Sequence, residues 1–184
     1  MKASLLAALS LVGLLGAPLG HAAEPVYPFF AFCMDTHDSQ HRTLQQQAEL
    51  LKELGYDGAG HLWTKQVKER LETLDAVGLK LYQISIQVTL SKEKDPYDPQ
   101  LKDVLPLLKG RNVMINLLMN GGKPSDTALD ARAVGIIKEI AEMAEPSGTR
   151  IVLYPHSNDW MERVEDAVRL AKQVNRPNVG VMFN

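Results

Sequence analysis

The sequence predicts an α/β protein with a parallel sheet, because short apolar runs of strand length alternate with stretches whose apolar residues recur at helical spacing. The clearest unit covers residues 150–184, where apolar runs at 151–153 and 179–183 bracket a helical pattern. Two strands that bracket one helix form a β-α-β unit, which requires parallel strands and places binding sites at their carboxyl ends. His156 and Asn184 stand at two of these ends.

Residues 1–22 have the composition of a signal peptide. Lys2 gives a short positive start, residues 3–19 are mostly apolar, and Gly20 and Ala22 supply the small residues of a cleavage site. The apolar stretch is short and no second one follows it, which favours a removed leader over a membrane anchor. We therefore expect residues 23–184 to be exported, to the periplasm in a Gram-negative cell, without attachment to the membrane after cleavage.

Charge and cysteine content limit the function classes. The formal net charge is −2 and the sequence has no run of Lys or Arg, which argues against nucleic acid as a partner. Cys33 is the single cysteine, so no intrachain disulfide can form. Because Cys33 lies in an apolar run, we interpret it as a small core residue; a nucleophilic role would need a base beside it.

The first strand-helix unit begins where the signal peptide is expected to end. The apolar run 29–34 predicts a strand. The polar residues 35–39 predict a loop at its carboxyl end, and they include Asp35 and His37. Apolar residues at helical spacing then predict a helix over 44–54.

The second unit has the same form. Strand 58–63 contains His61 near its end, and helix 67–77 follows until Gly78 stops it. The third strand, 79–88, shows a clear alternation of apolar and polar residues. This alternation predicts one face with Tyr82, Ile84, Ile86 and Val88, and an opposite face with Gln83, Ser85 and Gln87.

The middle of the chain continues the pattern. A short helix is predicted over 98–109 and a strand over 112–118. The Gly-Gly pair at 121–122 beside Lys123 could hold an anion through backbone N–H groups. Its spacing is not that of a phosphate loop, so an ordinary turn is favoured. An amphipathic helix is predicted over 128–144.

The helix of the last unit is expected to start soon after Asn158 or Asp159, either of which can cap it. Its apolar positions include Met161, at helical spacing from those that follow. Residues 175–178 end the helix before the final strand.

Two motifs near the end of the chain resemble the signature region of a known family. Residues 165–171 read Glu-Asp-Ala-Val-Arg-Leu-Ala, and residues 177–180 read Pro-Asn-Val-Gly. These motifs are similar to those of the xylose-isomerase-like TIM barrels, the superfamily of sugar phosphate isomerases and epimerases. Residues 54–58, Leu-Gly-Tyr-Asp-Gly, resemble that family's entry into its second strand. The resemblance implies a (β/α)8 TIM barrel.

The predicted barrel is incomplete. A closed barrel of this type needs about 250 residues, whereas six strands and about five helices are predicted within residues 23–184. We interpret this region as a barrel truncated after its sixth strand. Its two edge strands would expose unpaired backbone groups. Such a chain is expected to be poorly soluble alone, to pair with another copy as a homo-oligomer, or to continue further.

The resemblance also implies a divalent metal, Mn²⁺, Mg²⁺ or Zn²⁺, held partly by a Glu after strand five and an Asp after strand six. Tyr154 stands at the first of these positions and Asn184 at the second. A phenol is a poor ligand for a hard cation, and an amide oxygen binds one more weakly than a carboxylate does. These replacements count against a metal site and leave its ligands unknown. Asp35, after the first strand, is a weaker candidate.

Three histidines fall at the predicted carboxyl ends of strands, namely His37, His61 and His156. Active sites of TIM barrels lie at the carboxyl ends of the strands, and His gains and loses a proton near neutral pH. A lone His in a loop is more often solvated, but three at one face favour a catalytic site. His156 comes first, because the resemblance places a His there.

Substrate contacts are expected from other polar residues at the same face. Gln87 lies nearest the carboxyl end of its strand, and the alternative for it is an internal amide network, because polar side chains inside a barrel must find hydrogen-bond partners. Tyr154 shares the strand face of His156 by period two. The expected substrate-binding residues are Gln87, Tyr154, Asn184 and Asp35.

Together these features predict an exported protein that binds a small carbohydrate. The resemblance implies isomerisation, epimerisation or a related elimination on a keto-sugar or glycoside, and export favours an unphosphorylated substrate. The alternative is a non-catalytic carbohydrate-binding protein on a degenerate barrel, for which the replacements at positions 154 and 184 argue. Metal-dependent DNA repair, which uses the same kind of barrel, is disfavoured by export and by the acidic balance.

Overall fold

The computed structural model describes residues 27–183, so the predicted signal peptide and Asn184 lie outside the described residues. The described chain forms one sheet in the order β1-β2-β3-β4-β5-β6. Every neighbouring pair is parallel, which confirms the predicted α/β class. The strands are β1 (Phe30–Ala31), β2 (Gly58–Leu62), β3 (Lys80–Thr89), β4 (Met114–Asn120), β5 (Arg150–Leu153) and β6 (Val179–Val181).

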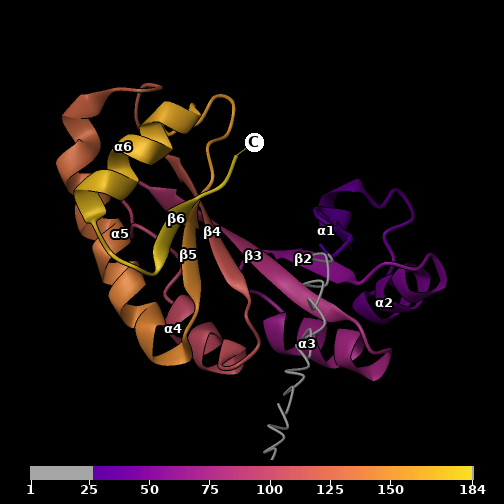
Figure 1. The fold of residues 1–184 in the computed structure, drawn as a ribbon. Helices are drawn as coiled ribbons and strands as arrows, with labels where there is room; N and C mark the ends of the chain where they lie inside the picture. Colours follow the sequence, from indigo (N-terminus) through magenta and orange to yellow (C-terminus); the bar gives the residue numbers. More distant parts are fainter. Residues whose placement is uncertain (1–26, 184) are drawn as a thin grey trace, which may run out of the picture.

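Helical segments connect these strands, and α3 to α6 lie along one side of the curved sheet (Figure 1). Among the described residues β1 and β6 have one neighbour each, so the sheet is open, as predicted for an incomplete barrel. No helix of this part of the chain is long and apolar enough to cross a membrane. The helices are α1 (Met34–His37), α2 (Leu44–Glu53), α3 (Val67–Ala76), α4 (Leu101–Val104), α5 (Asp130–Ala144) and α6 (Val164–Val174), with 3-10 turns η1 (Leu105–Leu108), η2 (Thr127–Leu129) and η3 (Glu145–Ser147).

The main core lies between the sheet and its helices. Ile115, Leu117 and Met119 alternate along β4, and all three are completely buried. Ile137 and Ile140 of α5 are also completely buried and belong to the same cluster. Burial of apolar surface at about 25 cal/mol per Å² is the main force that holds such layers together. The periods of two and 3.6 in the sequence therefore identify the residues that join sheet and helix.

A register shift corrects the predicted face of Tyr82. Ala59 pairs with Leu81 but Gly60 pairs with Gln83, so Tyr82 has no partner on β2. Leu81 consequently joins the core, and the Tyr82 ring stacks on Phe30, with ring centroids 4.9 Å apart. An irregularity of this kind moves a side chain to the other face of a strand.

The start of the last helix also differs from the prediction. Helix α6 begins at Val164, directly after its N-cap residue Arg163. The backbone N–H of Arg163 donates a hydrogen bond to the Asp166 carboxylate at 3.1 Å. Met161 lies in the preceding loop, where it is completely buried and its N–H donates to the carbonyl of Met119 at 3.1 Å. An apolar residue at helical spacing therefore packs into a loop here, and neither Asn158 nor Asp159 caps the helix.

The beginning of the chain differs as well. Strand β1 has only two residues, because the pairing with β2 stops at Ala31. The predicted polar loop instead contains the short helix α1, which ends at His37. Asp38 follows it and accepts hydrogen bonds from the backbone N–H groups of Gln40 and Arg42, at 3.1 and 2.9 Å. These bonds turn the chain towards α2.

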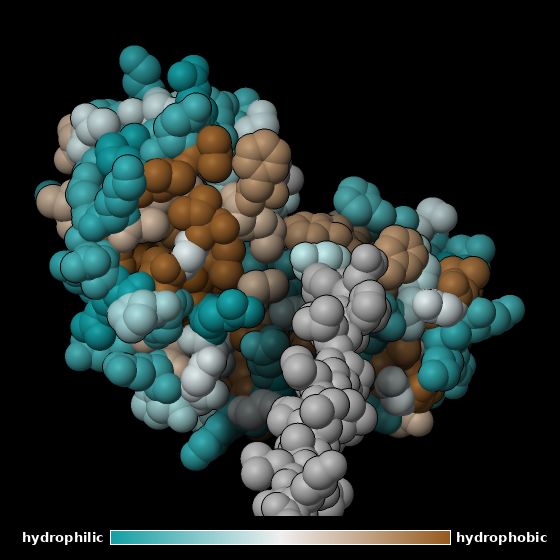
Figure 2. Space-filling model, viewed as in Figure 1, coloured by the Kyte–Doolittle hydropathy of each residue, from teal (hydrophilic) through white to brown (hydrophobic). Residues whose placement is uncertain are grey.

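The side of the sheet away from the helices changes in character across the molecule. Figure 2 shows apolar residues gathered beside β6 on the face in view. A groove of about 380 Å³ there is lined in part by Met114, Val152, Val179 and Val181. In the middle of the sheet the same side carries polar residues, where the Asn116 amide donates to the hydroxyl of Ser85 at 3.3 Å. Polar ligand chemistry is therefore concentrated around β3 and β4.

Candidate functional site

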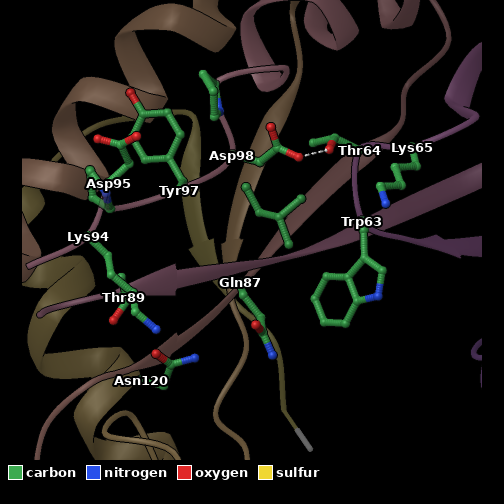
Figure 3. A pocket seen from close by; sticks show the side chains of 13 residues that line it. Trp63, Thr64, Lys65, Gln87, Thr89, Lys94, Asp95, Tyr97, Asp98 and Asn120 are labelled. Carbon is green, nitrogen blue, oxygen red and sulfur yellow. Dashed lines mark hydrogen bonds between the residues drawn. The ribbon is translucent and has the colours of Figure 1, made fainter.

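A cavity opens at the carboxyl ends of β2, β3 and β4 (Figure 3). Its volume is about 630 Å³, which lies in the range of small-molecule sites. One wall is the loop after β2, and the opposite wall is the loop 92–99, which folds back over the end of β3. The lining residues are Trp63, Thr64, Lys65, Ile86, Gln87, Thr89, Lys94, Asp95, Pro96, Tyr97, Asp98, Pro99 and Asn120.

The loop 92–99 is held in place by several contacts. The N–H of Thr89 donates to the carbonyl of Pro96 at 2.8 Å, and the Tyr97 hydroxyl donates to Glu139 of α5 at 2.6 Å. Arg132 donates to two backbone carbonyls just before this loop, both at 2.9 Å. Burial of the phenol, together with the Glu139 contact, raises the pKa of Tyr97. The wall is therefore built before any ligand arrives, and Tyr97 stays neutral.

Three polar side chains face the cavity from neighbouring strands. Gln87 and Thr89 lie two residues apart on β3, and Asn120 is the register partner of Thr89 on β4. Within the described part of the chain, the amides of Gln87 and Asn120 make no hydrogen bond to another residue. Each amide offers both a donor and an acceptor. The cavity floor therefore presents polar groups that are available to a ligand.

An aromatic side chain stands next to these amides. The indole of Trp63 is 41 % exposed and lines the cavity. Figure 3 shows Trp63 and Gln87 on adjacent sides of the cavity, with Lys65 near the indole. A half-exposed aromatic face beside convergent polar groups is typical of sites that bind small polar molecules with an apolar face.

The carboxylate of Asp98 belongs to the wall. It accepts a hydrogen bond from the hydroxyl of Thr64 and another from the backbone N–H of Gln100 at 2.9 Å. The Thr64 hydroxyl, the Gln100 N–H and the charge of Lys65 all lower the pKa of Asp98, against a smaller opposing effect of burial. Asp98 is therefore ionised at neutral pH and joins the two walls of the cavity.

Of the predicted site residues, Gln87 lines this cavity, whereas His61 points away from it. His61 pairs in register with Ile84, a core residue, and is only 5 % exposed. Its Nε2 lies 2.7 Å from the carbonyl of Lys65, and its Nδ1 accepts from the Nε of Arg70 at 3.3 Å. Both ring nitrogens of His61 are therefore engaged within the protein, on the helix side of β2.

Tyr154 and His156 lie together after β5. The Tyr154 ring is 6.1 Å from the His156 ring and 5.7 Å from that of Phe32, both edge-on. Burial raises the pKa of Tyr154, so its phenol is neutral. The Nδ1 of His156 is 3.0 Å from the carbonyl of Ser157 and donates to it. In the described region Nε2 of this exposed ring has no hydrogen bond, so it can accept a proton.

The remaining predicted residues lie elsewhere. His37 is exposed and lines a separate hollow of about 530 Å³ with Cys33 and Met34. The side chain of Asp35 and all of Asn184 are outside the described residues. The structure therefore brings Tyr154 and His156 together and places Gln87 in the main cavity, while His37 and His61 are separate from both.

Sequence reasoning missed Trp63, Thr89 and Asn120 as cavity residues. The alternation that places Gln87 on the inner face of its strand also places Thr89 there, so Thr89 could have been predicted from the same pattern. Trp63 is the last residue of the predicted second strand, and an aromatic residue at the carboxyl end of a strand could have been interpreted as a ligand contact. At the Gly-Gly pair the chain is closely packed, because a Cβ on Gly122 would lie 2.5 Å from Leu129 and 2.7 Å from Trp160.

The motif at 165–171 has a structural role. Asp166 accepts from the Ser125 hydroxyl at 2.7 Å and from Arg169 at 2.7 Å, besides the N–H of Arg163. Arg169 also binds Asp130 of α5 at 2.8 Å. Burial opposes ionisation of Asp166, but the bonds from Arg169, Ser125 and Arg163 outweigh it and lower its pKa. The motif thus ties α6 to α5 and to the loop after β4.

Similar folds occur among solved structures. The probable 3-DHS dehydratase AsbF of Bacillus anthracis, involved in petrobactin synthesis, has a TM-score of 0.68 at 16 % identity, with 84 % of this chain and 62 % of that chain covered. D-psicose 3-epimerase with D-tagatose, from Clostridium cellulolyticum H10, has a TM-score of 0.61 at 18 % identity, with 85 % and 63 % covered. This chain spans less than two thirds of each structure, and identities this low show a shared fold.

A third similar structure bears on the question of a metal. A xylose isomerase-like TIM barrel protein from Mycobacterium smegmatis, in complex with magnesium, has a TM-score of 0.58 at 18 % identity, with 84 % of this chain and 63 % of that chain covered. In residues 27–183 of the present chain, no group of three or more His, Cys, Asp or Glu residues is placed to hold a metal ion. The neutral, buried phenol of Tyr154 is not a suitable ligand for a hard cation. The described residues therefore do not fit a divalent metal.

The family follows from the sequence itself. No curated protein is a significant match to this chain. The family model described as "Xylose isomerase-like TIM barrel" matches residues 48–184, which include all strands from β2 to β6. The match agrees with the open parallel sheet and its outer helices. The chain belongs to the xylose isomerase-like TIM barrel family.

Proposed function

We propose that this chain binds an unphosphorylated keto-sugar or glycoside in the cavity between β2, β3 and β4, as part of a sugar isomerase or epimerase. The observation that carries this proposal is the half-exposed indole of Trp63 beside the free amides of Gln87 and Asn120. The family supports a carbohydrate ligand, because D-psicose 3-epimerase, solved with D-tagatose, has a similar fold.

Sugar chemistry matches this set of side chains. A sugar ring carries neighbouring hydroxyl groups, which both donate and accept hydrogen bonds, as the amides of Gln87 and Asn120 do. Its C–H faces are apolar and pack against an aromatic ring. In our proposal Trp63 covers one face of the ring, while the two amides and Thr89 bind hydroxyl groups along its edge.

His156 is the proposed acid/base group; it follows β5 and does not line the cavity, so in this proposal it acts on a part of the sugar that extends from the end of β4 towards β5. Isomerisation moves a proton from the carbon beside a carbonyl to a neighbouring carbon, which one group on one face of the sugar can do, whereas epimerisation returns a proton to the opposite face of the same carbon and needs a second proton donor there. With Nδ1 donating to the Ser157 carbonyl, Nε2 of a neutral His156 carries the lone pair that accepts the proton. Export to the periplasm, which the N-terminal sequence suggests, is the reason to propose a free rather than a phosphorylated substrate.

The test is a binding and exchange experiment on the whole chain. Titration with D-fructose, D-tagatose and D-psicose is followed by intrinsic tryptophan fluorescence. A bound sugar should change the emission of the exposed Trp63, whereas Trp160, at 1 % exposure, is shielded. We expect a saturable change that is absent in Trp63→Phe, with binding confirmed by calorimetry. Lack of binding to all ketoses and to simple glycosides would refute the proposal.

Proton transfer is tested separately by NMR in D₂O. Deuterium should enter the bound sugar at the carbon beside its carbonyl, and His156→Ala should abolish this exchange while the protein stays folded. Unchanged exchange in His156→Ala would remove that residue from the mechanism.

A non-catalytic carbohydrate-binding protein is the second candidate. It is favoured by the neutral Tyr154, which occupies the position of an expected carboxylate, and by the poor fit of the described residues to a metal. This candidate predicts saturable sugar binding that EDTA does not change, together with no product and no deuterium uptake. Turnover by the wild-type chain would eliminate it.

A further inference from the structure

The loop that presents Trp63 has a strained backbone. In residues 63–66, here called the Trp63 loop, both Trp63 and Gln66 lie in the left-handed region, with φ values of 68° and 57°. Side chains other than Gly rarely adopt this conformation, and it persists only where the surroundings fix it. The contacts around this loop therefore show what holds it in this conformation.

Each of the first three residues of the Trp63 loop makes a hydrogen bond to another part of the chain. The N–H of Trp63 donates to the carbonyl of Ser85 on β3 at 2.8 Å. The Thr64 hydroxyl donates to Asp98 on the opposite wall of the cavity. The carbonyl of Lys65 lies 2.7 Å from Nε2 of His61. The loop is thus attached to the sheet, to the facing loop and to the helix layer.

The hydrogen bond between His61 and the Lys65 carbonyl is itself held in place by further buried hydrogen bonds. Nδ1 of His61 accepts from Arg70, so Nε2 carries the ring proton and donates it to the Lys65 carbonyl. Arg70 is completely buried and donates in turn to Gln47 of α2 at 2.6 Å. A chain of buried hydrogen bonds therefore runs from α2 through α3 to the Trp63 loop.

The ring that this arrangement presents is not used for the core. Trp63 is 41 % exposed and lies outside the main hydrophobic cluster, in contrast to the buried Trp160. The strain of the loop is therefore not offset by burial of its largest side chain. Its visible result is an indole that faces the cavity beside Gln87 (Figure 3).

We propose that His61 and the Thr64–Asp98 pair are positioning residues, which fix the Trp63 indole in its ligand-binding orientation before the ligand arrives. This inference rests on the proposed function for its ligand, a sugar. A wall that is already ordered saves the conformational entropy that ligand binding would otherwise cost. Loss of either attachment should therefore loosen the indole and weaken sugar binding, and because Thr64 and Asp98 themselves line the cavity, the motion of the indole in the ligand-free chain is the deciding measurement.

The first test compares Thr64→Val with Thr64→Ser. Valine has a similar shape but cannot donate to Asp98, whereas serine keeps the hydroxyl. In the ligand-free chain we expect Thr64→Val to increase the motion of the Trp63 indole, seen as faster depolarisation of its fluorescence and stronger acrylamide quenching. The Kd for the sugar should rise roughly tenfold, while Thr64→Ser should stay close to wild type.

A matched control separates positioning from general stability. Thr73 of α3 donates its hydroxyl to the carbonyl of Arg70 at 3.2 Å and does not line the cavity. Thr73→Val should therefore leave both the indole motion and the Kd unchanged. The inference is overturned if Thr64→Val changes neither quantity, or if Thr73→Val changes them as much. Because indole motion is measured without ligand, it decides the inference even if the wild type binds no sugar.

A second pair of variants tests His61. Glutamine at position 61 keeps a side-chain N–H for the Lys65 carbonyl, and phenylalanine does not. If His61 acts by positioning, the His61→Gln variant should retain most of the turnover and most of the indole rigidity. The His61→Phe variant should raise KM more than it lowers kcat. Loss of kcat in His61→Gln with unchanged KM and unchanged indole motion would instead mark His61 as an acid/base group and refute the inference.

Discussion

The ring of Tyr154 lies edge-on to the ring of Phe32, with their centroids 5.7 Å apart. Phe32 follows β1 and Tyr154 follows β5, so this contact links the first strand of the open sheet to the fifth. Tyr154 is only 8 % exposed. The position where a carboxylate is expected from the family resemblance is therefore occupied by a packed aromatic ring.

The packing of Tyr154 predicts the outcome of restoring a carboxylate there. Tyr154→Glu removes the ring contacts with Phe32 and His156 and buries an acid, so it should lower the free energy of unfolding by about 1–3 kcal/mol. Tyr154→Phe keeps the ring and should change stability by less than about 0.5 kcal/mol. Urea unfolding measures both. A Tyr154→Glu chain that is as stable as wild type and binds Mn²⁺ would show that the site is still built for a metal.

The hydrogen bonds of Asp166 predict a pH-dependent stability. Asp166→Asn weakens the contacts with Arg169, Ser125 and the N–H of Arg163 and should cost about 1–3 kcal/mol at pH 7. The folded-state pKa of Asp166 is lowered, so its contribution is complete above the unfolded value of about 3.9 and is lost as the pH falls through the folded-state pKa.

Urea unfolding of wild type and Asp166→Asn at a series of pH values checks this sign. The difference between the two chains should be largest near neutral pH and should shrink as the pH falls below about 4. Ser125→Ala removes a single partner and should give a smaller loss at pH 7. A difference that grows at low pH would contradict the assignment.

Much of the fold could be predicted because the periodic signals of strand and helix are strong. The alternation of Ile115, Leu117 and Met119 reflects burial against the helices, and that burial decides the face. The predictions failed where a local event interrupts the period. One is the register shift that turns Tyr82 towards Phe30. Another is the loop before α6, which buries Met161 without being helical, and a third is the helix α1 in the polar segment after the short β1.

The candidate site was less predictable, because its walls come from distant parts of the chain. Gln87 could be found from its place near a strand end. The link between Thr64 and Asp98 spans 34 residues, and no local pattern indicates it. Whether the His61 side chain faces the helices or the inner side of the sheet depends on the register of β2 against β3, because a shift of one residue reverses the face. That register is set by the irregularity at Gly60.

Gly122 offers a test of how tightly the loop after β4 is packed. A Cβ at this position would lie 2.7 Å from the ring of Trp160, which is held by a 2.8 Å hydrogen bond from its Nε1 to the carbonyl of Asp126. Gly122→Ala should therefore lower the free energy of unfolding by about 1–3 kcal/mol. Gly135 in α5 is the control, since a Cβ there meets nothing within 4 Å. Gly135→Ala should stabilise the helix by about 0.5–1 kcal/mol, and equal effects at the two sites would contradict this account.

Two glutamines on the inner side of β3 should respond oppositely to the same substitution. Gln83 is 1 % exposed, and neither its amide oxygen nor its amide nitrogen has a hydrogen-bond partner in the described region. An unpaired buried amide is costly, so Gln83→Met should raise the free energy of unfolding by about 1 kcal/mol and leave sugar binding unchanged. Gln87 lines the cavity, so Gln87→Met should leave stability within about 0.5 kcal/mol and raise the sugar Kd roughly tenfold. Urea unfolding and calorimetric titration separate the two effects. A loss of stability in Gln83→Met would mean that its amide is paired, as by an ordered water within the barrel, and would extend the polar network of Asn116 and Ser85 by one residue.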